Sequence, residues 1–365
     1  MRVVAGLAGA GLIVLMLSEF FVIYLLPRRV KRDPRIARGI YSLLWRPWRR
    51  LGRRIGGSGG DTLLGFFGPL GMLALLSVLA IGLVTGFALL HWAFHSDLVS
   101  RAPTRFADDV YYSAGAFISA NENLRAGDGW AKALTILEAG SGLAVLFIVI
   151  GYLPALYQAF SAREIAVSQL DARAGSPPDA GLFLARSVRH GGWDALDEFL
   201  LRWEAWSAEL METHLAYPIL CWFRSQHVNQ NWLAAMVCVM DASAFTIAAA
   251  PDGEGESARL TFAIGRHAMA DLSYTVHAKP RKDNPERLDA ETLAALIAEV
   301  RDEGVTVNEE GLEERLAELR AMYEPYAYAL AHHLELALPV WWAPDRQEEN
   351  WRQTAWRVQR RTPLP

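Results

Sequence analysis

Residues 131–160 read AKALTILEAGSGLAVLFIVIGYLPALYQAF, and this apolar stretch decides the class of protein. At 1.5 Å per residue, about twenty residues cross the ~30 Å hydrocarbon core of a bilayer. A stretch of this length leaves room for tilt or for an extension into water. It therefore predicts a helix that spans a membrane.

Two more apolar stretches lie upstream, at residues 62–92 and 3–26, and the second of these contains one charge, Glu19. A cleaved signal peptide is the alternative for residues 3–26. Against it, the basic cluster follows the apolar run instead of preceding it, and no small-x-small cleavage site closes the run. We expect three spans and an all-α membrane protein.

The connection at residues 27–61 sets the orientation, because it holds eleven Lys or Arg against two acids. Short loops this basic stay in the cytoplasm. The predicted location is a cell inner membrane with multiple spans, the N-terminus outside and everything after residue 160 inside. Trp45 and Trp48 predict an amphipathic segment on the inner leaflet, where arginines attract anionic membrane lipids.

The loop between the second and third stretches contains TRFADDVYYSAGAFISANENLRAGDGW at residues 104–130. Thr104 is the expected N-cap of a short helix with Val110, Tyr111, Ala114 and Phe117 on one face, and a polar string follows it. A helix too short to span, followed by polar backbone, is what a re-entrant pore loop requires.

Residues 108–160 resemble the pore module of bacterial potassium-channel-like proteins with two core spans. DVYYSAGAFIS is similar to the pore helix of that family, and LEAGSGLAVLFIVIGYLPALYQAFSARE to its inner helix. SQLDARAGSPPDA and YPILCWFRSQHVNQNWLAAM also resemble one branch of it, so the likeness covers about residues 62–365. It implies a pore-loop cation channel core that assembles as a homotetramer.

The selectivity filter departs from the family. In place of Thr-x-Gly-Tyr-Gly the chain has Ser119, Ala120, Asn121, Glu122 and Asn123. Asn tolerates left-handed backbone better than other residues with a side chain, and Ser119 keeps the hydroxyl of the family's threonine.

Glu122 admits three interpretations. Four copies around an axis form an acidic ring that favours Na⁺ or divalent cations. Alternatively, Glu122 points away from the axis and pairs behind the filter. In the third interpretation conduction is lost, and the protein is a non-conducting, channel-derived membrane scaffold or sensor.

Several residues of the spans are candidates for gating or for intramembrane chemistry. Gly140 and Gly142 are either a hinge or a place of close helix contact, and Pro154 is expected to kink the inner helix. Glu19 is expected to pair near the basic end of its span, although intramembrane acids are functional candidates by default. Glu138 is expected to support the pore helix or to line the outer cavity.

Residues after 160 read as a helical cytosolic domain with a turn-rich linker at its start. The domain organisation is therefore an N-terminal span with a basic loop (1–61), a pore domain (62–160), a linker (161–181) and an α-helical domain (182–365). The apolar run after Asn231 is interrupted by Asp241 and is expected to be a buried core helix, with a fourth span as the alternative.

Composition argues against several other functions. Two cysteines exclude a disulfide scaffold or a four-thiolate zinc site within one chain, and residues 161–365 carry twenty basic against thirty-one acidic residues, which disfavours nucleic-acid binding. This acidity beside a basic loop suggests that the two dock. His332, His333 and Glu335 lack metalloprotease spacing. We expect no enzyme and no cofactor beyond permeant cations, and leave open an unidentified cytosolic ligand or partner.

Overall fold

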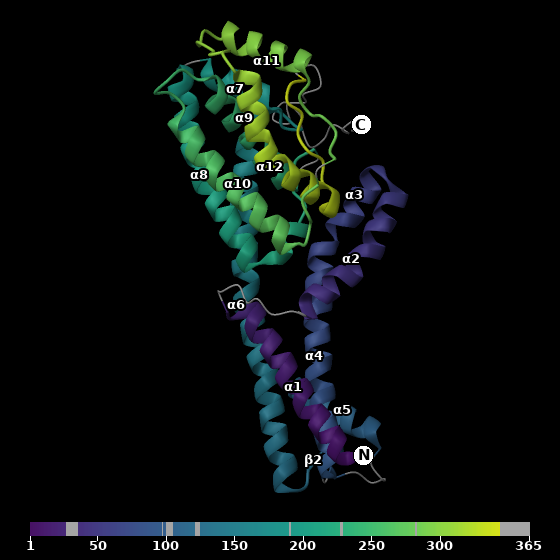
Figure 1. The fold of residues 1–365 in the computed structure, drawn as a ribbon. Coiled ribbons are helices and arrows are strands. Elements are labelled where there is room, and N and C mark those ends of the chain that lie inside the picture. Colours follow the sequence, from purple (N-terminus) through teal and green to yellow (C-terminus); the bar gives the residue numbers. More distant parts are fainter. Residues whose placement is uncertain are drawn as a thin grey trace, which may run out of the picture. The chain divides into compact units, whose positions relative to one another are not determined.

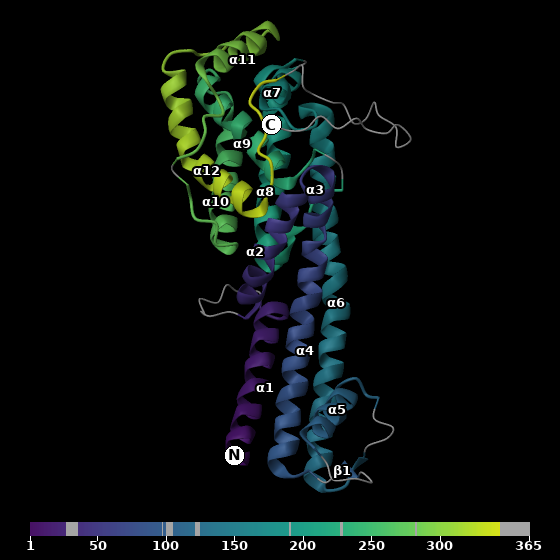
Figure 2. The ribbon, with the colours of Figure 1, turned by 90° about the vertical axis from the view of Figure 1, so that its right-hand side faces the viewer.

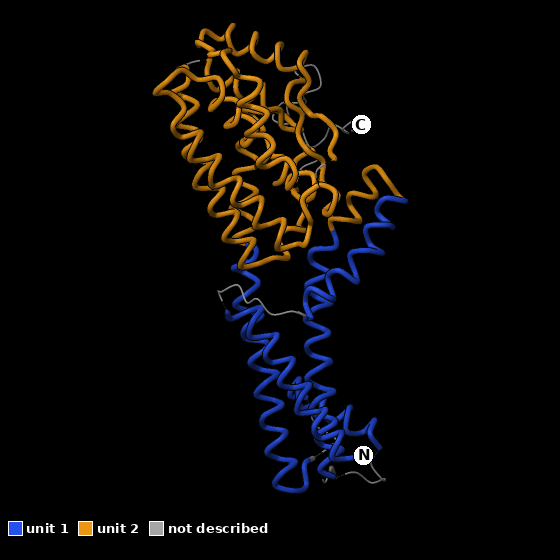
Figure 3. Tube along the Cα trace, viewed as in Figure 1, with its two compact units in different colours: residues 1–54, 66–157 blue, residues 55–65, 158–365 orange. Residues whose placement is uncertain are grey.

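A computed structural model describes residues 1–26, 36–96, 98–99, 105–120, 125–189, 191–226, 229–281 and 283–343. These residues form two compact units, coloured separately in Figure 3. Unit 1 contains residues 1–54 and 66–157, and unit 2 contains residues 55–65 and 158–365. The described part of the chain is almost entirely helical, as the sequence predicts.

Unit 1 is built from long helices that run beside one another, with a short helix at one end (Figures 1 and 2). Its elements are α1 (Arg2–Tyr24), α2 (Ile36–Ile55, whose last residue belongs to unit 2), α4 (Phe67–Phe94), β1 (Leu98–Val99), α5 (Phe106–Phe117), β2 (Arg125–Ala126) and the first part of α6 (Gly129–Ala174). β1 and β2 form a two-residue antiparallel ladder in which Val99 pairs with Arg125.

Small residues let α1 lie close to α4. A Cβ on Gly9 would come within 2.7 Å of the Gly86 carbonyl oxygen, and one on Gly86 within 2.7 Å of Ile13. Such close approach is typical of packed membrane helices, because lipid provides no hydrophobic force between them. Met16 and Phe20 then pack against Leu75, Leu79 and Leu83.

Four helices are long and apolar enough to span a membrane, three of them in the predicted places: α1, the helical segment Gly57–Phe94, and α6. The fourth is α9 (Trp232–Ala249), in unit 2. Of its most apolar window 94 % is buried, against 17 % for α6. A helix that is apolar all round and enclosed by its own unit is a core helix, which is what the sequence favoured over a fourth span.

The predicted linker at 161–181 is mostly helical. α6 continues to Ala174, and the turn is confined to the following residues, which include Gly175, Pro177 and Pro178. Residues 161–174 contain no Gly or Pro, so nothing in their backbone stops the helix earlier.

Unit 2 surrounds α9 with other helices (Figures 1 and 2). Its remaining elements are α3 (Gly57–Gly65), α7 (Ala180–Val188), α8 (Gly192–Ala216), the 3₁₀-helix η1 (Pro218–Trp222), α10 (Glu256–Thr275), α11 (Ala290–Asp302) and α12 (Leu312–Leu334). Helix starts follow ordinary capping chemistry, because Asp179, Asn231 and Asp289 each accept a backbone N–H three residues on.

A buried ionic network ties α9 to α12 and to the segment after α12. Arg287 pairs with Asp241 and donates to Glu324 Oε1 at 3.1 Å and to the Pro339 carbonyl at 3.1 Å. The Tyr323 hydroxyl donates to Asp241. Trp341, 1 % exposed, lies beside the guanidinium of Arg287 at 6.0 Å, so this tryptophan packs into the unit.

Replacing Arg287 by Met should lower the free energy of unfolding of unit 2 by about 3–5 kcal/mol, because Asp241 would keep a buried charge without its partner. Thermal and denaturant unfolding of the detergent-solubilised protein, followed by tryptophan fluorescence, measures this. Arg301→Met is the control, since that side chain is 54 % exposed and its ion pair with Glu309 should contribute at most about 1 kcal/mol. Equal losses in the two variants would contradict the network's role.

Candidate functional site

The short helix α5 packs parallel to α6. The Tyr112 hydroxyl bonds the Thr135 hydroxyl at 2.7 Å, Ser113 faces Glu138, and a Cβ on Gly142 would lie 1.9 Å from the Phe117 carbonyl oxygen. Later residues of α5 therefore meet later residues of α6.

This register fixes how far α5 reaches. Gly142 lies thirteen residues beyond Gly129, the start of α6, which is about 20 Å along the helix axis. On α4, Phe117 packs against the cluster that includes Leu79 and Leu83, which lie fifteen and eleven residues before the end at Phe94. Both helices thus place the end of α5 well inside the span, although α5 has only 12 residues.

Arg125 lies near the end of α4 again, because it pairs with Val99 just beyond that helix. Residues 121–124 connect Ala120 to Arg125. Asn121, Glu122 and Asn123, three of the predicted filter residues, lie outside the described part of the chain.

The two described filter residues, Ser119 and Ala120, close the end of α5. Ser119 has a left-handed backbone with φ of 58°, and the N–H of Ala120 bonds the Gly115 carbonyl at 2.7 Å. Ser119 thus adopts the left-handed backbone that Asn121 and Asn123 are expected to tolerate. The first turn also differs from expectation. Arg105, not Thr104, is the N-cap, because its N–H is bonded by the Asp108 carboxylate at 2.7 Å.

The polar face of α5 is the one that packs within unit 1. Asp109, Tyr112, Ser113 and Ala116 are buried, while Tyr111 on the predicted apolar face is 63 % exposed. This face is buried because α4 and α6 carry polar side chains opposite it, among them His91, Thr135 and Glu138. Of the predicted apolar face, Tyr111 is exposed, whereas Phe117 packs against the cluster that includes Leu79 and Leu83.

A buried polar cluster joins α4, α5 and α6. The side chains of His91 and Glu138 are both fully buried, with His91 Nε2 3.8 Å from Glu138 Oε2. His91 Nδ1 bonds the Ser96 hydroxyl at 2.8 Å, and its ring meets the Tyr112 ring edge-on at 5.2 Å. Glu138 therefore lies beside α5, next to Ser113 and His91.

The cluster contains polar atoms that nothing in the described part of the chain bonds. They are His91 Nε2, Ser113 Oγ and both carboxylate oxygens of Glu138. Four such atoms in one buried place are unusual, because leaving a buried polar atom unpaired costs about 1–3 kcal/mol. The cluster is therefore the chemically distinctive place in unit 1.

Sequence reasoning singled out Glu138 but missed His91 and Ser113. A signal for His91 existed, since it is the sole titratable residue in the apolar run 62–92. Ser113 carried no signal, because a serine in a short helix is ordinary.

The remaining predicted residues fall in separate places. Glu19 is buried and its carboxylate accepts the Ala37 N–H at 3.1 Å, so it bonds the first turn of α2. α6 passes through Pro154 without a break in its helical structure. The two glycines differ in their surroundings. Gly142 contacts α5, whereas a Cβ on Gly140 would meet nothing within 4 Å.

One face of α6 is exposed among the described residues. Its exposed residues recur at alternating steps of three and four, and they are Leu137, Gly140, Ala144, Phe147, Gly151 and Pro154. This spacing forms a straight stripe along a helix, the pattern that packs helices against one another.

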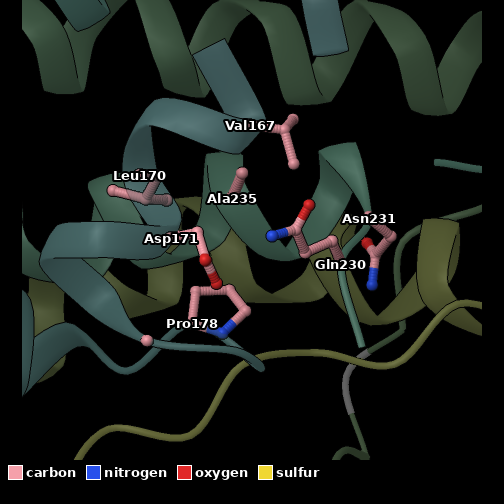
Figure 4. Close-up of a pocket in the computed structure, with 8 residues that line it drawn as sticks. Val167, Leu170, Asp171, Pro178, Gln230, Asn231 and Ala235 are labelled. Atoms are coloured by element: carbon pink, nitrogen blue, oxygen red, sulfur yellow. The ribbon is translucent and has the colours of Figure 1, made fainter. Parts of the chain in front are cut away.

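Unit 2 contains a small pocket, shown in Figure 4, with an empty volume of about 190 Å³ and an opening to solvent. Asn231 is occupied as the cap of α9 and donates to the Ala337 carbonyl at 3.1 Å. Gln230 Oε1 is buried without a partner among the described residues. Asp171 also lines this pocket, beside the apolar Val167 and Leu170. A space this small with a few polar groups suits a water molecule better than an organic ligand.

Comparisons with protein-family models, with curated proteins and with solved structures find no match to this chain. Its function is therefore inferred from the residues and their geometry.

Gly142→Ala should displace α5, because a methyl group cannot share space with the Phe117 carbonyl. We expect a lower midpoint for thermal unfolding of the detergent-solubilised protein, measured by size-exclusion chromatography after heating. Gly140→Ala is the matched control and should leave the midpoint unchanged or slightly raised, since Ala favours helix by up to about 1 kcal/mol over Gly. A lower midpoint for Gly140→Ala alone would contradict the assigned contact.

His91→Leu should destabilise more than Glu138→Gln, because the first leaves a buried carboxylate without its nearest possible cation. Combining His91→Leu with Glu138→Leu should recover part of the loss, since an apolar pair avoids both desolvation penalties. The same heating assay tests this as a double-mutant cycle. Strict additivity of the single losses would show that the two residues are not coupled.

Proposed function

We propose that the protein is a tetrameric pore-loop channel that conducts cations across a cell inner membrane, with the N-terminus outside and unit 2 in the cytoplasm. The observation that carries the proposal is α5. A helix too short to span lies between two candidate spans, runs parallel to α6 and ends about 20 Å along it.

The direction of α5 favours cations. Its carbonyl end, which carries about half a negative charge, lies deep in unit 1 at Phe117. The residues that follow, Ser119 to Asn123, are the proposed filter, and Glu122 adds four carboxylates to a tetramer. An acidic ring at that place favours Na⁺ or divalent ions over K⁺.

The uncovered face of α6 supports assembly from several copies. Only 17 % of the most apolar window of α6 is buried within the chain, and Phe147 is 68 % exposed. In a tetramer the stripe with Gly140, Ala144 and Gly151 faces the axis and the neighbouring α6 helices. One pore loop per chain then supplies a quarter of the filter.

The first test is flux of K⁺, Na⁺ and Ca²⁺ into vesicles that contain the purified protein. We expect Na⁺ or Ca²⁺ to pass, and Glu122→Gln to lower their permeability relative to K⁺. Glu198→Gln, the same chemical change on an exposed side chain of α8, is the control. Flux that is K⁺-selective and unchanged in Glu122→Gln would place Glu122 behind the filter. Folded tetramer without any flux would favour the scaffold.

Helix α2 supports a second element of this proposal, contact with anionic lipid. It carries six arginines and no acid, and Arg46, Arg50 and Arg54 are exposed. Its other face is apolar, and Trp45 packs edge-on against Phe67 of α4 at 4.7 Å. A helix of this kind lies in the membrane interface with arginines on lipid phosphates.

Changing Arg46, Arg50 and Arg54 together to Gln should reduce the number of phosphatidylglycerol molecules retained per subunit. Each arginine near an anionic surface contributes about 1 kcal/mol. Native mass spectrometry of protein extracted from mixed-lipid vesicles counts the bound lipid. The control changes Arg202, Arg259 and Arg281, three exposed arginines of unit 2, and should retain lipid like the original protein.

A further inference from the structure

One short segment of unit 2, residues 218–226, holds two helices that lead directly into candidate spans. We call it the clamp segment; it comprises η1 and the four residues after it. Arg163 of α6 binds the clamp segment. Arg224, which belongs to the clamp segment, contacts α3 and the end of α12.

Arg163 is fully buried and nearly all its donors are used. It donates to the Leu220 carbonyl at 3.0 Å and to the Phe223 carbonyl at 2.9 Å, both in the clamp segment. Its charge is balanced by Glu164 at 2.9 Å, and Ser225 of the clamp segment donates to that same carboxylate at 3.1 Å. The planar, fork-shaped guanidinium of an arginine has five N–H donors and can bond all of these acceptors together. The single ammonium group of a lysine cannot.

His214 completes the pocket of Arg163 as a neutral side chain. Its Nδ1 donates to the Leu210 carbonyl at 2.8 Å, so Nε2 is the acceptor for Arg163 at 3.3 Å. Burial and the neighbouring Arg163 lower the pKa of His214 well below its usual value. The arginine is therefore the only positive charge of this pair.

Arg224 connects the clamp segment to α12 and α3. It donates to the carbonyls of Leu334 and Glu335, at the end of α12, at 2.8 and 2.7 Å. It also lies 3.4 Å from the Asp61 carboxylate of α3. This pair joins an acid of the basic loop to an arginine of the acidic domain, the reverse of the charge pairing that the sequence suggested.

Both tied helices continue toward the proposed pore. Residue 66 alone separates α3 from α4, and α6 runs unbroken from unit 1 into unit 2. We propose that the clamp segment couples these two helices, with Arg163 and Arg224 as positioning residues that transmit rearrangement of unit 2 to α4 and α6 and so set how often the channel opens. This inference rests on the proposed function.

Single-channel recording of the whole protein in planar bilayers tests the coupling. Asp61→Asn removes one tie at a side chain that is 67 % exposed, so folding should be unaffected; Arg163→Lys keeps the charge but loses the fork. Both relax the same conformation, so both should shift open probability in the same direction, about two- to five-fold for Asp61→Asn. Unitary conductance and permeability ratios should not change.

Arg202→Lys, an exposed arginine of α8, is the control and should match the original protein. Open probability unchanged in both test variants overturns the coupling, as does a change confined to unitary conductance. A general loss of folding cannot explain the expected result, because Asp61→Asn should also keep the original unfolding midpoint.

A distance measurement separates failure of this inference from failure of the proposed function. Spin labels at Ser58→Cys and Ser168→Cys report the separation of α3 and α6 in chains diluted with unlabelled protein. Burial raises the pKa of the Cys221 thiol to about 12 and that of Cys238 well above its usual value, so the native thiols do not take the label. If no ion flows, conduction is wrong; the coupling still predicts a broader distance distribution in Asp61→Asn and Arg163→Lys, and an unchanged one overturns it.

Discussion

Helix α5 can lie against α6 only because residue 142 has no side chain. The Phe117 carbonyl occupies the place where a Cβ would stand, and this contact sets the depth that α5 reaches. The positions of Tyr112 beside Thr135 and of Ser113 beside Glu138 follow from the same register. The proposed conduction depends on that depth, because a short helix at the surface of the bilayer would be a plain connector.

The same packing brings polar groups into a dry place. In hydrocarbon, water cannot satisfy a carboxylate or an imidazole, and yet His91 Nε2, Ser113 Oγ and the Glu138 carboxylate make no hydrogen bond among the described residues. Their imperfect pairing contrasts with the ionic network around Asp241 in unit 2, where Arg287, Tyr323 and Glu324 all bond closely. The first arrangement leaves hydrogen-bonding capacity unused beside the proposed filter; the second uses it to hold α9, α12 and the following segment together.

Unit 2 is consequently well suited to transmit motion. Its core helix is enclosed, and its clamp segment is bonded by the buried Arg163 of α6 and faces Asp61 of α3 through Arg224. In the proposed coupling, a segment that contacts both α3 and α6 moves the two helices together. In this proposal, the large helical unit acts on the opening of the channel through α4 and α6.

The amino-acid sequence by itself determined the helical class, the three principal apolar helices and the burial of α9, because length, hydropathy and helical period act locally. It also indicated a short helix before α6. Only tertiary structure decided which face of α5 is buried, which of two glycines makes the contact and that His91 meets Glu138. Those outcomes depend on residues far apart in the chain, and a single position such as Gly142 has no local signature that distinguishes it from Gly140. Close packing acts between elements, and it is what distinguishes Gly142 from Gly140.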